Sequence, residues 1–166
     1  MSNHHAIRLA SGLIAFLVLP GVVAITVPIL IGRTDPWHGS GWGLGWAVWL
    51  VGMAILLCCV RDFFAIGRGT LAPWDPPKTL VIVGLYRFAR NPMYVGVFTT
   101  IVGWSLIFGS WLVVVYALLV ASVFHLQVVF YEERVLSRQF PADWQAYARA
   151  VPRWIPRIKA GVRNDR

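Results

Sequence analysis

The sequence predicts an all-α, polytopic membrane protein with four transmembrane helices, and three observations carry that prediction. Of its 166 residues, 58% are hydrophobic and only 13% are charged, whereas a typical soluble domain has about 25% charged residues. The apolar residues are gathered into three long stretches that contain no Asp, Glu, Lys or Arg. The basic residues lie between and after these stretches. Such a composition excludes intrinsic disorder, and the length suits one domain over residues 1–166.

The three uncharged stretches have room for four spans. A helix needs about 20 apolar residues to cross a hydrocarbon core of about 30 Å. Residues 9–31 and 42–60 each supply one such helix. The third stretch is long enough for two, and Gly109-Ser110 lies near its middle as a natural turn. We therefore predict a helical hairpin with spans at 94–108 and 111–131.

The basic residues determine the predicted orientation. Residues 61–91 contain five Lys or Arg and the tail after residue 131 contains eight, whereas the linker at 33–41 contains one and the hairpin turn none. The positive-inside rule places both basic segments in the cytoplasm, and four spans then put both termini there. Topology thus explains the net charge of +8, and we expect no nucleic-acid partner because no aromatic and basic module of that kind is present. The compact form suggests a bacterial inner membrane.

Cysteine and histidine do not point to a metal. Cys58 and Cys59 are adjacent inside the second predicted span, where thiols are typical packing residues. His4 and His5 lie at the N-terminus without a third ligand nearby. We expect no metal site.

The loop between the second and third spans is the first polar part of the chain. Three prolines between residues 73 and 77 break it, since proline fixes φ and restricts the residue before it. It ends in ARNPMYVG, with Asn91 as the expected N-cap and Pro92 in the first turn of the third span. A helix start at a membrane surface offers unpaired N–H groups that could hold a carboxylate or a ribose. A capped helix flanked by arginines at the headgroups explains the same residues without a ligand.

The second polar part begins with Tyr131-Glu132-Glu133 at the end of the fourth span. Carboxylates are unfavourable near the negative C-terminal end of a helix dipole, so either a cation such as Arg90 or Arg134 lies against them or the helix continues beyond them into water. Beyond them, apolar residues at spacings of three and four predict one amphipathic helix, which lies on the bilayer or folds back over a cytoplasmic pocket. Its apolar face comprises Leu136, Phe140, Trp144, Tyr147 and Val151.

These two parts contain two motifs that resemble a known family. The first is GLYRFARNPMYVG at 84–96, and the second is EERVLSRQFPADWQAYARAVPRWIP at 132–156. Together they resemble the isoprenylcysteine carboxyl methyltransferase family and its phospholipid methyltransferase relatives, in which a G-x-Y-x-x-x-R-H/N-P-x-Y motif precedes a helical hairpin and an E-E-x-x-L segment follows it. The resemblance covers about residues 76–158, the expected catalytic core, and leaves 1–60 as two further spans of the same domain.

The resemblance implies an integral-membrane methyltransferase that uses S-adenosylmethionine. In that family the cofactor lies in a cytoplasmic pocket, here expected between the 61–94 loop and the C-terminal helix, and a lipophilic substrate enters from the bilayer. Carried over by position, the cofactor contacts are Lys78, Leu80, Val81, Tyr86, Asn91, Pro92, Met93, Tyr94 and Glu132.

Four positions depart from the family pattern, and one of them is Pro141, which stands where the family has Gly and is expected to change only a turn. Asn91 replaces the usual His, and Lys78 stands where His is frequent. Val128 occupies the position, four residues before the first Glu, of an Arg that binds substrate in the eukaryotic enzymes. This last departure argues against a prenylcysteine carboxylate as acceptor.

The catalytic roles depend on the acceptor, which the sequence leaves open. Methyl transfer needs a nucleophile held about 3 Å from the methyl carbon in a site closed to water. Arg90 or Arg153 would orient a carboxylate or thiolate, whereas Glu133 would take the proton of an amine or thiol. A phospholipid headgroup amine and a small thiol are therefore alternative acceptors. An NADPH-dependent enzyme similar to membrane sterol reductases and a non-catalytic membrane scaffold are the alternatives of another class.

Overall fold

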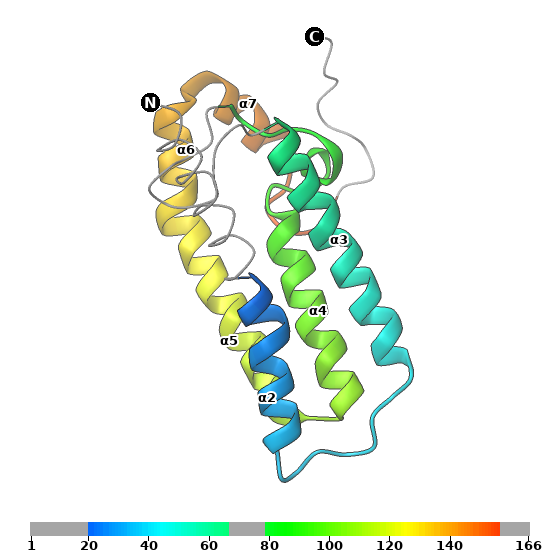
Figure 1. The fold of residues 1–166 in the computed structure, drawn as a ribbon. Helices are drawn as coiled ribbons and strands as arrows, with labels where there is room; N and C mark the ends of the chain where they lie inside the picture. The colour runs from blue at the N-terminus through cyan, green and yellow to red at the C-terminus, as the bar shows by residue number, and fades with distance from the viewer. Residues whose placement is uncertain (1–19, 67–78, 157–166) are drawn as a thin grey trace, which may run out of the picture.

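The computed structural model describes residues 20–66 and 79–156, and all regular elements in this part of the chain are helical. The helices form four rod-shaped segments, here called rods, that run side by side (Figure 1). The first is η1 (Val22–Thr26) continued by α2 (Val27–Thr34), and the second is α3 (Leu44–Ile66). The third is α4 (Pro92–Phe108), preceded by the short 3₁₀ helix η2 (Gly84–Arg87). The fourth is α5 (Trp111–Gln127), continued by η3 (Val128–Glu132) and α6 (Glu133–Gln139), before α7 (Pro141–Ala150).

Glycines let α3 and α4 approach each other closely. Gly45 and Gly52 on α3 and Gly96 and Gly103 on α4 each recur after seven residues. A Cβ atom at Gly52 would lie 2.5 Å from the Thr100 nitrogen, and one at Gly103 would lie 2.6 Å from the Trp49 backbone. Small residues at helix interfaces in membranes permit this kind of backbone contact. The pair α3–α4 is therefore the closely packed centre of the fold.

The first rod attaches to this centre through backbone carbonyls of a π-helical turn. In η1 the Val27 N–H donates to the carbonyl of Val22, five residues earlier. The indole of Trp104 donates to the Ala24 carbonyl at 3.0 Å, and the Tyr116 hydroxyl donates to the Val23 carbonyl at 3.0 Å. Ala24 and Trp104 also belong to the buried apolar cluster that joins all four rods. A π turn thus presents two carbonyls to donors on α4 and α5.

Hydrogen bonds close the end of the bundle that holds the α4–α5 turn. Gly109 ends α4 with φ +58, and its carbonyl accepts from the Gly39 N–H at 2.9 Å. Asp35 accepts from the Ser110 hydroxyl at 2.5 Å and from the Trp37 N–H at 2.9 Å. The bond from Ser110, followed by that from Trp37, lowers the pKa of the Asp35 carboxyl. The predicted turn at Gly109-Ser110 is confirmed, and the carboxylate additionally ties it to the end of α2.

The structure confirms the all-α prediction for its described residues, but only two stretches are long and apolar enough to cross a membrane. These are Leu44–Asp62 and Trp111–Gln139. Pro92–Phe108 is apolar but has 17 residues, about 25 Å of helix, because Pro92 and Gly109 bound it. Val22–Thr34 is also shorter, and residues 9–19 of the predicted first span lie outside the described residues. Four long spans were therefore predicted where two are found.

The two long helices carry apolar side chains on their outward surface. Contiguous exposed apolar surface of this extent is typical of contact with another apolar phase. The exposed residues include Leu44, Leu50, Val51 and Leu57 on α3, and Leu118, Leu119, Val123 and Leu126 on α5.

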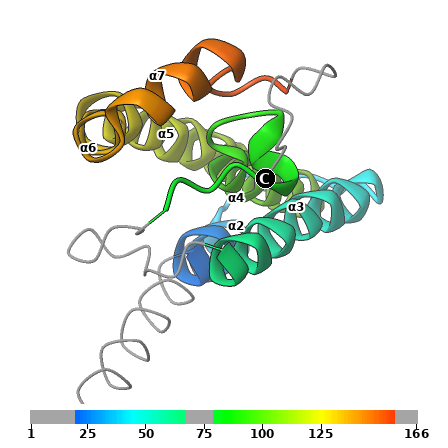
Figure 2. The same cartoon turned by 90° about the horizontal axis from the view of Figure 1, so that it is seen from above.

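The fourth rod differs from its prediction at two places, at the start of the second motif and at Phe140 within it. The helix that was expected to end at residue 131 continues to Gln139. The π turn η3 joins α5 to α6 without a break, and in it the Glu133 N–H donates to the Val128 carbonyl. The single amphipathic helix predicted beyond it is wrong, since the chain breaks at Phe140, which has φ −130 and ψ 64. Pro141 then begins α7, which turns back over the end of the bundle (Figure 2). A proline in the first turn is compatible with a helix start but not with a continuing helix.

Candidate functional site

The run from Gly84 to Asn91 forms an elbow that leads into α4. Gly84 has φ +52, a left-handed conformation that glycine adopts without strain. A side chain there would collide with the carboxylate of Asp62, near the end of the first long span. Asn91 is the N-terminal boundary residue of α4, as predicted, but its side chain makes no capping bond. The first turn of α4 therefore keeps N–H groups that no Asn91 side chain satisfies.

The end of the described chain, residues 151–156, lies on this elbow and is here called the strap. The Arg90 N–H donates to the Pro152 carbonyl at 2.8 Å. Both the backbone N–H and the side-chain amide of Asn91 donate to the Arg153 carbonyl at 3.3 Å. Asn91 thus holds the strap rather than capping its helix. The two motifs, which are separated by the α4–α5 hairpin, meet here.

The two motifs meet a second time at Tyr94 and Glu132. The Tyr94 hydroxyl on α4 donates to the Glu132 carboxylate on η3. Gln127 on α5 donates to the same carboxylate at 3.1 Å and to the Tyr94 hydroxyl at 3.3 Å. Glu132 is half-buried, and the two side chains that donate to its carboxylate here, Tyr94 and Gln127, are neutral.

The neighbouring carboxylate, that of Glu133, has the opposite environment. Arg90 donates to one of its oxygens at 3.0 Å. Arg153 donates to both oxygens, at 2.7 and 2.9 Å. Arg90 also lies 5.5 Å from the centre of the Trp144 ring, and this guanidinium has a lowered pKa because of its burial. The three predicted catalytic residues thus form an ion triad in which Glu133 accepts from both Arg90 and Arg153.

Helix α7 covers the elbow with an apolar cluster. Trp144, Tyr147 and Val151 are buried and pack against Leu80 and further apolar residues. The Tyr147 hydroxyl donates to the Tyr86 carbonyl at 2.7 Å. Burial raises the pKa of both phenols, so both hydroxyls keep their protons across the physiological range. The predicted apolar face is therefore confirmed as a packing surface, although two helices share it instead of one.

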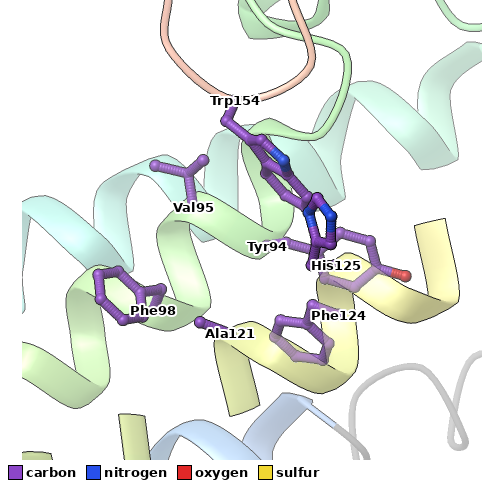
Figure 3. Close-up of a pocket in the computed structure, with 7 residues that line it drawn as sticks. All are labelled: Tyr94, Val95, Phe98, Ala121, Phe124, His125 and Trp154. Atoms are coloured by element: carbon purple, nitrogen blue, oxygen red, sulfur yellow. The ribbon is translucent and has the colours of Figure 1, made fainter. Parts of the chain in front are cut away.

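A cavity of about 320 Å³ opens between α4 and α5 below the strap. Its walls are Tyr94, Val95 and Phe98 on one side and Ala121, Phe124 and His125 on the other (Figure 3). Trp154 of the strap completes the lining, with its ring 6.0 Å from that of His125. Tyr94 belongs both to the cavity and to the contact with Glu132, because it lines the cavity while its hydroxyl donates to the Glu132 carboxylate. The lining is almost wholly apolar.

A comparison with family models matches residues 43–143 to phospholipid methyltransferase. The match runs from the start of α3 to the start of α7 and includes the elbow, Tyr94 and Glu132. The chain belongs to the phospholipid methyltransferase family. This confirms the family that the two motifs predicted. Comparisons with curated proteins and with solved structures returned no match.

The phospholipid methyltransferase fold brings most predicted site residues to one end of the bundle. Tyr94 and Glu132 are in contact, and Tyr86 lies near enough for Glu132 to add to the effect of burial in raising its pKa. Lys78 lies outside the described residues. Four other predicted residues have packing roles in the structure. Leu80 packs under α7, Val81 and Pro92 are buried, and Met93 packs against the main apolar cluster.

Sequence reasoning missed three residues around this candidate site. Asp62 was not considered, although it lies just beyond a long uncharged stretch. Gln127 and His125 were missed because they lie inside a segment that was assigned as a membrane span from its lack of charged residues. A search for polar residues one or two helical turns before Glu132 would have found both.

Replacing Glu133 with Gln tests whether the ion triad holds the strap in this member of the family. The substitution leaves two guanidiniums facing a neutral amide, and we expect a loss of about 1–3 kcal/mol in the free energy of unfolding, the scale of a charged hydrogen bond. Thermal unfolding in detergent and tryptic cleavage near the strap measure it. Arg134→Gln on the same turn is the control, since Arg134 is exposed. Equal losses in the two variants would contradict a holding role.

Proposed function

We propose that this protein is an integral-membrane methyltransferase that takes its methyl group from S-adenosylmethionine and passes it to a lipophilic or amphipathic acceptor. The observation that carries the proposal is the contact between Tyr94 and Glu132, which lie 38 residues apart on the two motifs. A half-buried tyrosine and a carboxylate that accepts from the neutral donors Tyr94 and Gln127, at the mouth of an apolar cavity, suit a cationic nucleoside better than a purely structural contact.

The groups around this contact fit the parts of the cofactor. The Glu132 carboxylate can accept hydrogen bonds from ribose hydroxyls or from an ammonium group. The uncapped first turn of α4 can donate N–H groups to a carboxylate. The Arg90 Nε is buried without a hydrogen-bond partner among the described residues, which is unusual for a buried donor unless a ligand completes it. The aromatic faces of Tyr86 and Tyr94 suit a sulfonium, since cations are attracted to such faces.

The protein's own residues would act by positioning and by excluding water. When bound, S-adenosylmethionine supplies an electrophilic methyl group on a cationic sulfur, and transfer leaves a neutral thioether. Glu132 and the first turn of α4 would hold the polar parts of this donor. The strap and α7 would cover it, because the triad fastens the strap to α6 and Tyr147 fastens α7 to the elbow. A closed, aligned site of this kind supplies most of what a displacement reaction needs.

The proposed topology keeps the four rods as membrane-embedded helices with the elbow, strap and α7 at the cytoplasmic surface. Basic residues gather at this end, as the positive-inside rule requires. The shorter α4 would be accommodated by local thinning of the bilayer at modest cost. Both termini would then be cytoplasmic, in a bacterial inner membrane.

Cofactor titration of the full chain in detergent separates this function from its alternatives. We expect saturable binding of S-adenosylmethionine and transfer of a labelled methyl group to a lipid fraction when membranes are incubated with it. Binding of NADPH without S-adenosylmethionine would replace the proposal with a reductase. Binding of neither would indicate a non-catalytic scaffold.

A further inference from the structure

His125 is a titratable side chain of the cavity that has no part in holding the methyl donor as proposed above. His125 lies on α5, in the cavity wall, and faces Trp154 of the strap with 6.0 Å between the ring centres (Figure 3). Apart from Tyr94, every other residue that lines this cavity has a side chain without an ionisable group. His125 is exposed rather than packed into the protein core, so packing does not account for it.

The cavity suits the acceptor better than the methyl donor. The donor carries a carboxylate, an ammonium and a sulfonium, and the burial of charges without partners is costly. Besides Tyr94 and His125, the lining offers a hydrocarbon chain two aliphatic side chains and three aromatic rings, between helices whose outer surface is apolar. Tyr94 separates the cavity from Glu132 and contacts both. An acceptor in the cavity would therefore meet the donor next to the Tyr94 ring.

The polar end of such an acceptor would lie beside an imidazole rather than a guanidinium. Arg90 and Arg153 both donate to Glu133, and neither lines the cavity. Glu133 accepts from both arginines and is likewise absent from the lining. The structure thus removes the predicted arginines and the predicted base from the place where the acceptor would sit. It leaves a histidine, which is the most frequent general base in enzymes.

We propose that His125 is the proton acceptor of the methyl transfer, and hence that the acceptor carries its proton on nitrogen or sulfur. An imidazole nitrogen of His125 would take the proton from the acceptor's N–H or S–H group. The freed lone pair then forms the bond to the methyl carbon, the carbon–sulfur bond of the donor breaks, and its electron pair returns to sulfur. The imidazolium afterwards releases the proton to water at the cytoplasmic end of α5, beside the strap. Trp154 would fix the plane of the ring, because the strap holds it against His125.

This proposal rests on the proposed function, and its test measures binding and transfer separately. The full chain in mixed micelles is given methyl-labelled S-adenosylmethionine with phosphatidylethanolamine or with dodecanethiol as acceptor. For His125→Ala and His125→Phe we expect kcat to fall by about 10²–10⁴-fold, the usual worth of a general base, while the cofactor Kd changes less than about twofold, since no donor-binding group is altered. Free imidazole should restore part of the rate in His125→Ala but not in His125→Phe, where the new ring fills the space.

Controls separate a chemical role from a packing role. Ser122→Ala, on the same helix and exposed, should keep the wild-type rate. A wild-type rate in His125→Phe would overturn the proposal, because an aromatic ring facing Trp154 would then be sufficient. So would methyl transfer by the wild type to a farnesylcysteine carboxylate but to neither of the other acceptors. A wild type that binds no S-adenosylmethionine would overturn the proposed function itself, and this inference with it.

Discussion

Glu132→Gln should weaken the binding of S-adenosylmethionine by about 10–100-fold while leaving the protein folded. The charge is lost but the shape is kept, and the new amide oxygen can still accept from Tyr94 and Gln127. A hydrogen bond to a charged group is worth about 1.5–3 kcal/mol, and each 1.4 kcal/mol is about tenfold in affinity. Equilibrium binding of the labelled cofactor in detergent measures the effect, with thermal unfolding as the check on the fold.

Tyr94→Phe is the matched control for this substitution. It removes the hydroxyl but retains both the aromatic face and the Glu132 carboxylate. We expect a smaller loss of affinity than for Glu132→Gln, because the carboxylate keeps its bond from Gln127. An unchanged Kd in Glu132→Gln would remove this carboxylate from the cofactor site.

Gly103→Val should prevent recovery of the folded protein, and Gly103→Ala should lower the free energy of unfolding by about 1–3 kcal/mol, the usual cost of overpacking. A Cβ atom at this position would lie 2.6 Å from the backbone nitrogen and Cα of Trp49 and 2.7 Å from its Cβ. Backbone atoms cannot rotate away as a side-chain tip can, so α3 and α4 would have to separate. Near-ultraviolet circular dichroism reports this directly, because the Trp49 and Trp104 rings lie 5.6 Å apart at 68°.

Gly43→Ala provides the comparison, since a Cβ atom there would have no heavy atom within 4 Å. Its unfolding temperature should stay close to that of the wild type. If Gly43→Ala lost as much stability as Gly103→Ala, general effects of replacing glycine would explain the result and the close approach of α3 and α4 would not matter.

Hydropathy and charge predicted the helices of this protein well but could not predict where hydrogen bonding changes along them. The α3 span and the turn at Gly109-Ser110 followed from uncharged length and from glycine. The π turns η1 and η3 did not, because a change of hydrogen-bond partner leaves the apolar pattern intact. The break at Phe140 was missed for a related reason: its apolar spacing continues through Pro141, and packing of both helices on the same cluster preserves that spacing.

Some features of the candidate site could likewise be predicted from the motifs, whereas others are evident only in the folded structure. The meeting of Tyr94 with Glu132 could be predicted, since a hairpin returns the chain to the end where it began. The use of Glu133 as the centre of an ion triad could not, because the sequence offers several arginines of equal merit. His125 was overlooked because a histidine does not interrupt a stretch without Asp, Glu, Lys or Arg, and only the structure shows that it lines the cavity.

The π turn η3 makes the position of both glutamates sensitive to chain length. A π turn contains one residue more than the α-helix could accommodate in the same rise. Because η3 already holds one extra residue, a further insertion between 128 and 131 would extend the helix regularly, and everything beyond would rotate by about 100° around its axis. The composition of the segment would hardly change, yet Glu133 would swing away from both arginines and α7 would leave the elbow. A further insertion here should therefore be far less tolerated than substitutions.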